Sequence, residues 1–211
     1  MASTVSARES ESVFGDDDAA VHRIGAPFVF DGRAGEGAMA MPATIHVCPM
    51  TRVEGTVTSS GARHLVSLLT AGTDFGRPAL IAAENHLWLT MNDIVAAQDG
   101  LTPPGRAHVE ALLDFARRWD RDAPLVINCF AGISRSTAAA YIVAAALAPG
   151  RDEHELARTL RALSPSATPN LLLVGLADDL LRRDGRMVAA IAAIGRGAEA
   201  FEGTPFALPI S

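Results

Sequence analysis

Short apolar runs alternate with segments whose apolar residues recur every three or four positions from residue 41 onward. The short runs are typical of strands and the longer spacing is typical of helices. Alternating strands and helices favour an α/β layer fold. We therefore expect a central, mostly parallel sheet of about 4–5 strands, flanked by helices on both faces as a three-layer sandwich. The predicted strands span residues 44–48, 64–69, 79–83, 86–90 and 125–128.

Apolar stripes at helical spacing predict five helices after residue 100. Asn170 suits the N-cap position of the fourth, and Gly195 suits the C-terminal end of the fifth. The five are recognised by the face of Val109, Leu112, Leu113, Ala116 and Trp119, the span from Arg135 to about Leu147, the stripe of Leu156, Leu160 and Leu163, the segment after Asn170, and the segment ending at Gly195.

The 211 residues suit one domain, expected over residues 41–211. Residues 1–40 mix Ser, Gly, Ala and acidic residues without periodicity, which predicts a tail of low order. Met41 stands just before the first strand, and one hypothesis is that the native product starts there. The amino terminus lacks the basic and apolar regions of a secretory signal. We therefore expect a cytoplasmic protein with reduced cysteines.

The net charge is −6, and all 18 basic residues are arginine. No basic block stands out, which argues against nucleic acid as a partner. The longest apolar stretch has about 13 residues, too few to span a bilayer, so no membrane association is expected. An alanine-rich and lysine-free composition indicates a GC-rich bacterial genome. Nothing in the pattern predicts an oligomeric state.

The stretch "VINCFAGISRSTAAAYIV" places Cys129 between a predicted buried strand and a predicted buried helix. Backbone amides at such a helix start would bind an oxyanion, and Arg135 would grip two of its oxygens. The same positive field favours the thiolate of Cys129. A thiolate below a bound phosphate is placed for in-line attack on phosphorus. The predicted phosphate loop consists of Phe130, Ala131, Gly132, Ile133, Ser134 and Arg135.

"NCFAGISRST" resembles the signature of the cysteine-based protein tyrosine phosphatase superfamily, usually His-Cys-x5-Arg-Ser/Thr. The layout is similar to the dual-specificity-like branch, and especially to its small bacterial members. "LTMNDIVAAQDGLTPP" falls where the family carries its general-acid loop. "SPSATPNLLLVGLADDL" resembles the family's Pro-Asn element after the signature helix. The resemblance covers roughly residues 42–185.

The resemblance implies hydrolysis of phosphomonoesters through a phosphocysteine on Cys129, with no metal or cofactor. It makes Asp93 the general acid, favoured over Asp99 by its Asn-Asp context, and Ser136 the group that stabilises the departing thiolate. Asn128 replaces the family's histidine, which predicts weakened rather than abolished chemistry. The phosphate loop has no basic side chain besides Arg135, which favours a singly phosphorylated ligand. Protein phosphotyrosine is the expected substrate, and small phosphomonoesters stay open.

Other interpretations of the same residues lead to different functions. The main alternative is a catalytically weak module that binds phosphoproteins through the phosphate loop, an idea supported by Asn128. Retention of both Cys129 and Asp93 argues for the enzyme instead. Arsenate reduction through the same loop lacks the additional paired cysteines that redox chemistry tends to need.

The second cysteine, Cys48, is interpreted as an inert core residue. A lesser hypothesis makes it a resolving thiol for oxidised Cys129. The histidines and cysteines show no metal-ligand spacing.

Overall fold

Four parallel strands form the centre of the sheet in the computed structural model, which describes residues 21–22 and 43–210. Their order is β4-β3-β5-β2, so β5, which ends at Cys129, lies between two parallel neighbours. The predicted tail and the Met41 hypothesis lie outside the described residues, apart from residues 21–22. The four strands are β2 (Thr44–Pro49), β3 (His64–Leu69), β4 (His86–Thr90) and β5 (Leu125–Cys129).

Two short antiparallel strands complete the sheet at its edges. The two-residue β1 (Val21–His22) pairs with β4, and β6 (Phe206–Pro209) pairs with β2. Pro209 lies in an edge strand, where a residue without an amide hydrogen is tolerated. The prediction of a mostly parallel α/β sheet is confirmed. The described sheet has six strands, because the sequence pattern did not reveal either edge strand.

The strand predicted over residues 79–83 is wrong. The Ile81 amide donates to the Pro78 carbonyl at 3.0 Å, which closes a turn, and the 3-10 helix η2 (Ala83–Asn85) follows. Leu80 is 60% exposed, whereas Ile81 is fully buried. The run is therefore apolar in composition without being a strand, because only one of its large side chains enters the core.

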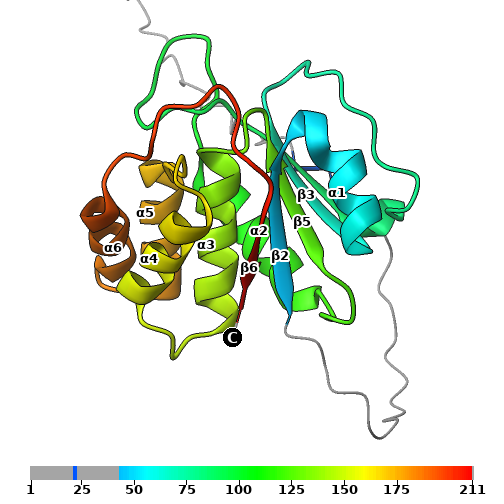
Figure 1. Cartoon of the computed structure of the whole chain (residues 1–211). Coiled ribbons are helices and arrows are strands. Elements are labelled where there is room, and N and C mark those ends of the chain that lie inside the picture. Colours follow the sequence, from blue (N-terminus) through cyan, green and yellow to red (C-terminus); the bar gives the residue numbers. More distant parts are fainter. Residues whose placement is uncertain (1–20, 23–42, 211) are drawn as a thin grey trace, which may run out of the picture.

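Helices cover both faces of the sheet unequally, as Figure 1 shows for α1 on one side and α3 to α6 on the other. The helix α1 follows the 3-10 helix η1 (Met50–Arg52) and packs on one face with Cys48, Val126 and Ile81. The other face carries the larger core. The helices are α1 (Val53–Ser60), α2 (Arg106–Arg118), α3 (Arg135–Leu147), α4 (Glu153–Leu163), α5 (Leu171–Leu181) and α6 (Arg186–Ile194).

The five helices predicted after residue 100 are confirmed, with differences at single residues. Asn170 caps α5 by accepting a hydrogen bond from the Leu173 amide at 3.1 Å. Leu163 is 40% exposed at the end of its stripe, so it is not a core residue. The sequence pattern did not indicate α1, since "VEGTVTSS" is rich in poor helix formers and depends on the packing of Val53 and Val57.

Strand pleating decides which face each residue of β5 occupies. Ile127 and Cys129 belong to the larger core, whereas Val126 belongs to the α1 side. The helix α3, which follows the phosphate loop, is buried along most of its length between the sheet and α5. Because this burial begins at Arg135, the first turn of α3 is held firmly in place beside Cys129. Within the described residues, no helix is long and apolar enough to cross a membrane.

Candidate active site

Cys129 is the last residue of β5, and Arg135 is the first residue of α3. The phosphate loop (residues 130–135) therefore lies at the carboxyl ends of the parallel strands. Ligands of open α/β sheets bind at this edge. The loop also begins a thirteen-residue helix, so its amides and the helix dipole act together on any bound anion.

The Cys129 thiol is almost fully buried, at 2% exposure. Its Sγ atom lies 3.1 Å from Oγ of Ser136 and accepts a hydrogen bond from the Gly132 amide at 3.2 Å. Both contacts suit a sulfur atom that carries negative charge, because a hydroxyl and an amide can each donate to it. The structure thus brings Cys129 and Ser136 together.

Gly132 allows the phosphate loop to turn tightly against the end of β2. Its φ is +71°, in the left-handed region, and a Cβ at this position would lie 2.6 Å from the Pro49 nitrogen. The Met50 amide also donates to the Phe130 carbonyl at 3.1 Å. Only glycine meets both the dihedral and the steric requirement, so the loop's conformation depends on this residue.

Arg135 is buried, and its guanidinium is held by groups at the ends of neighbouring strands. Nη1 donates to the Met91 carbonyl at 2.8 Å and to the Thr70 hydroxyl at 3.4 Å. Nε has no hydrogen-bond partner among the described residues, and it lies 3.7 Å from Oδ2 of Asp93. A buried donor without a partner is costly, so this N–H is available to an oxyanion in the loop.

Asp93 lies against the phosphate loop, although it is 41 residues before Ser134. Its Oδ1 accepts hydrogen bonds from the Ser134 hydroxyl at 2.7 Å and from Nδ2 of Asn170 at 2.8 Å. Its carboxylate is about one-third exposed, so solvent and a leaving group can reach it. Asp99 is exposed in the same connecting segment and has no hydrogen bond to the phosphate loop among the described residues.

Asn128 points away from Cys129, as expected for the preceding residue of a strand. Its Oδ1 accepts a 2.7 Å hydrogen bond from Ser67, whose Oγ lies 3.0 Å from Nε2 of His86. The Ser67 hydroxyl uses its hydrogen to donate to Asn128. In the contact between Ser67 and His86, Nε2 of His86 is therefore the donor and the Ser67 oxygen is the acceptor. Burial, followed by the charge of Arg77, lowers the pKa of His86 to about 4, so this ring is neutral at pH 7.

The amide nitrogen of Asn128 is buried and has no hydrogen-bond partner in the described part of the chain. It therefore gives the phosphate loop no hydrogen bond. By the resemblance, the family's histidine at this position would donate a hydrogen bond to the backbone of the phosphate loop, and Asn128 does not replace that bond.

Cys48 is buried on the α1 side of the sheet, whereas Cys129 on the adjacent strand belongs to the core of the opposite face. Burial raises the pKa of the Cys48 thiol to about 12, with a smaller raising effect from Cys129 and a lowering one from a Thr56 hydrogen bond. An inert core residue fits this environment better than a resolving thiol. No group of three or more His, Cys, Asp or Glu side chains in the described residues is arranged to hold a metal ion.

Some residues of this site were not predicted from the sequence. Asn170 was expected only as an N-cap, yet its amide also holds Asp93 and donates to the Ile94 carbonyl at 3.2 Å. The Pro-Asn element was the only signal that could have indicated this. Gly203 donates from its amide to the Ala131 carbonyl at 2.8 Å. No local pattern marks that contact, since it joins segments more than 70 positions apart.

Solved structures with similar architecture include two phosphatases. One is a mouse protein described as a dual specificity phosphatase and crystallised with zinc tungstate. It has a TM-score of 0.51 and 16% identity, and the match covers 75% of this chain and 98% of that one. The chain has the dual-specificity phosphatase fold. The second, PTP-2 phosphatase from Cydia pomonella, has a TM-score of 0.50 and 17% identity, with 64% and 84% covered.

Comparison of the sequence with known proteins identifies no further relative. No family model and no curated protein matches the chain. The phosphatase-like α/β fold predicted from the sequence is confirmed by the two structures. At 16–17% identity the agreement concerns the fold, and the chemistry depends on the site's own residues.

Proposed function

We propose that this protein hydrolyses phosphomonoesters without a metal ion, through a phosphocysteine on Cys129. Protein phosphotyrosine is the proposed substrate. The observation that carries the proposal is the convergence of three groups at the phosphate loop. Cys129 lies at its start and Asp93 beside it. Arg135 lies at its end, and among the described residues its Nε has no hydrogen-bond partner and lies 3.7 Å from Oδ2 of Asp93. Nucleophile, anion-binding group and carboxyl group are the minimum set for this chemistry.

In the first step, the Cys129 thiolate attacks phosphorus and the bond from phosphorus to the ester oxygen breaks. Asp93, in its protonated form, gives its proton to the leaving oxygen. Oδ1 of Asp93 already accepts two hydrogen bonds, and Oδ2 lies 3.7 Å from Nε of Arg135. When Nε binds the phosphoryl group instead, Oδ2 is the oxygen that carries the proton. Arg135 and the loop amides neutralise the charge of the transferred phosphoryl group.

In the second step, water attacks the phosphorus of the phosphocysteine and the phosphorus–sulfur bond breaks. The Asp93 carboxylate now takes a proton from the water. The electron pair returns to sulfur, where the Ser136 hydroxyl and the Gly132 amide stabilise the thiolate. Inorganic phosphate leaves, and both Cys129 and Asp93 regain the forms with which they began.

The side chains of the phosphate loop support a singly phosphorylated substrate. Arg135 is its only charged residue, so a second phosphate would find no counter-charge in the loop. Phe130 is 54% exposed at the loop's start, where it offers a ring surface to an aromatic group. These features favour phosphotyrosine on a protein over a phosphoinositide.

The experiment is hydrolysis of p-nitrophenyl phosphate in EDTA by the wild type and by Cys129→Ser. Turnover that persists in EDTA and is lost in the variant supports the proposal. Turnover that EDTA abolishes contradicts the metal-independent mechanism, and turnover that survives in Cys129→Ser contradicts the cysteine nucleophile. Circular dichroism of both proteins establishes that the variant is folded.

A phosphoprotein-binding module is the second candidate function. Asn128 favours it, because its amide nitrogen gives the phosphate loop no hydrogen bond and its side chain is uncharged. This candidate predicts that a folded wild type binds a phosphotyrosine peptide and releases no p-nitrophenol.

A further inference from the structure

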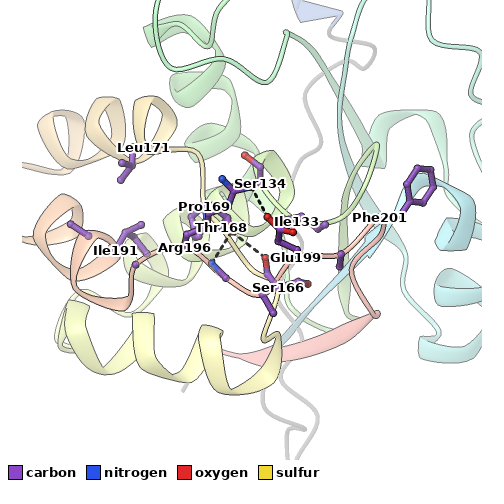
Figure 2. Close-up of a pocket in the computed structure, with 15 residues that line it drawn as sticks. Ile133, Ser134, Ser166, Thr168, Pro169, Leu171, Ile191, Arg196, Glu199 and Phe201 are labelled. Atoms are coloured by element: carbon purple, nitrogen blue, oxygen red, sulfur yellow. Dashed lines mark hydrogen bonds and ion pairs between the residues drawn. The ribbon is translucent and has the colours of Figure 1, made fainter.

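A cavity of about 890 Å³ lies beside the phosphate loop, as Figure 2 shows. Ile133 and Ser134 of the loop form part of its wall, so it adjoins the candidate active site. The opposite wall comes from α5 and α6, through Leu171 and Ile191. A third wall is formed by residues 195–201 of the C-terminal segment (residues 195–205), which Figure 1 shows passing from α6 towards β6. Pockets of this size bind ligands larger than a single side chain.

Hydrogen bonds hold the C-terminal segment in place and preform the cavity. The Ala198 amide donates to the Pro165 carbonyl at 2.9 Å, and the Gly203 amide donates to the Ala131 carbonyl at 2.8 Å. A Cβ on Gly203 would lie only 2.8 Å from the Gly132 oxygen, so the close approach requires glycine. The Arg161 guanidinium donates further hydrogen bonds to the carbonyls of Ile194, Ala167 and Gly195.

The cavity wall is largely apolar, and its two charged residues form a pair of opposite sign. Its exposed apolar surface includes the half-buried Ile133, Leu171 at 46% exposure and Phe201 at 88% exposure, while the lining residues Pro169 and Ile191 are themselves buried. The two charged lining residues, Arg196 and Glu199, are exposed and lie 3.9 Å from each other. A wall of this kind favours an uncharged, apolar ligand, because burying exposed apolar surface is favourable and no unpaired charge must be neutralised.

We propose that this cavity is a subsite for apolar side chains that flank the phosphorylated tyrosine of a substrate peptide. The proposal rests on the proposed function, since the phosphate loop would hold the phosphoryl group. Ile133 and Ser134 belong to both the phosphate loop and the cavity wall, so the cavity lies within reach of residues that flank a phosphotyrosine held in the loop. The volume exceeds that of one side chain and accommodates two or three residues.

The test measures binding of fluorescent phosphotyrosine peptides to the full chain carrying Cys129→Ser, which keeps the peptide intact. Three peptides are compared: one with glycines around phosphotyrosine, one with two leucines before it, and one with two leucines after it. One leucine-bearing peptide is expected to bind about tenfold more tightly than the glycine peptide, the effect of burying one leucine side chain.

Substitutions on α6 provide a matched pair. Ala192 lines the cavity, whereas its neighbour Ala193 does not, and both are exposed. Added to the Cys129→Ser protein, Ala192→Trp is expected to remove the preference for leucine by filling the cavity. Ala193→Trp is expected to leave it unchanged. Neither substitution in the wild type should alter hydrolysis of p-nitrophenyl phosphate, which is too small to reach the cavity.

Equal affinities for the three peptides overturn the subsite, and so does a leucine preference that survives Ala192→Trp. Absence of binding by every phosphopeptide overturns it as well. The proposed function has its own readout in the release of p-nitrophenol by the wild type. A leucine preference without turnover therefore supports the subsite and contradicts the proposed enzyme. Turnover without a leucine preference supports the enzyme and contradicts the subsite.

Discussion

Nδ2 of Asn170 donates a 2.8 Å hydrogen bond to Oδ1 of Asp93, 77 residues earlier in the chain. The same Asn170 side chain accepts from the Leu173 amide and so caps α5. One residue thus joins the start of a helix to the proposed general acid. The carboxyl group is thereby positioned by a buried helix end as well as by its own connecting segment.

Asn170→Ser separates these two roles, since serine caps a helix almost as well as asparagine but is too short to reach Asp93. Loss of a hydrogen bond to a carboxylate costs about 2 kcal/mol, so we expect kcat for a phosphotyrosine peptide to fall about tenfold or more. The melting temperature should fall by only a few degrees, because the helix cap is kept. An unchanged kcat would mean that Asn170 acts only as a cap.

Replacing each candidate acid in turn tests its role. Asp93→Asn is expected to lower kcat for a phosphotyrosine peptide by about 10²–10⁴-fold, and Asp99→Asn is expected to leave it within about twofold. The loss should be smaller for p-nitrophenyl phosphate, because p-nitrophenolate leaves more readily without a proton. Equal losses for both substrates, or a larger loss from Asp99→Asn, would contradict Asp93 as the acid.

Gly132→Ala and Gly72→Ala compare two glycines with nearly the same φ, +71° and +76°. A Cβ on Gly72 meets nothing within 4 Å, whereas one on Gly132 would clash with the backbone at Pro49. We expect Gly72→Ala to cost about 1 kcal/mol of unfolding free energy and Gly132→Ala about 3 kcal/mol or more. Urea unfolding provides the values. Only Gly132→Ala should also abolish hydrolysis of p-nitrophenyl phosphate.

His86 is expected to make the fold sensitive to acid. Its pKa is lowered to about 4 in the folded state, from 6.5, by burial and by Arg77. The unfolded chain therefore binds more protons at this residue between these values, and stability falls as the pH drops from 6.5 towards 4. Between pH 6.5 and pH 5, the free energy of unfolding is expected to fall by about 2 kcal/mol because of His86.

His86→Gln keeps a donor for Ser67 but does not titrate. Urea unfolding at pH 7 and pH 5 is expected to show a smaller decrease in stability for the variant than for the wild type. The difference between the two proteins is what matters, since burial also lowers the pKa of His46, His64 and His108. Parallel decreases in both proteins would exclude His86 as the source.

The two cysteines are expected to differ in reactivity. Cys48 keeps its proton well above pH 8, because its pKa is raised to about 12, and it lies in the core on the α1 side. Iodoacetamide at pH 8 should therefore leave Cys48 unmodified in the folded protein, while Cys129 reacts and is protected by inorganic phosphate. Peptide mass spectrometry identifies the modified residue. An intramolecular disulfide after mild peroxide would restore the resolving-thiol hypothesis.

Much of the site could be predicted because it is local in sequence. Cys129, Arg135 and Ser136 lie within eight positions, and a strand and a helix on either side determine how they are presented. The alternation of apolar runs likewise predicted the parallel sheet. Ala79 to Ala83 misled the prediction, since apolar composition does not reveal that Pro78 begins a turn.

The sequence by itself determined the parallel strand–helix order, the position of the phosphate loop after β5 and the residue types available for chemistry. These follow from periodicity and short-range spacing, which act within a few residues. Only the tertiary structure decided that Asn170 holds Asp93, that Gly203 meets Ala131 and that the C-terminal segment lines a cavity. Such contacts join residues tens of positions apart, and packing of the whole chain determines them rather than any local preference.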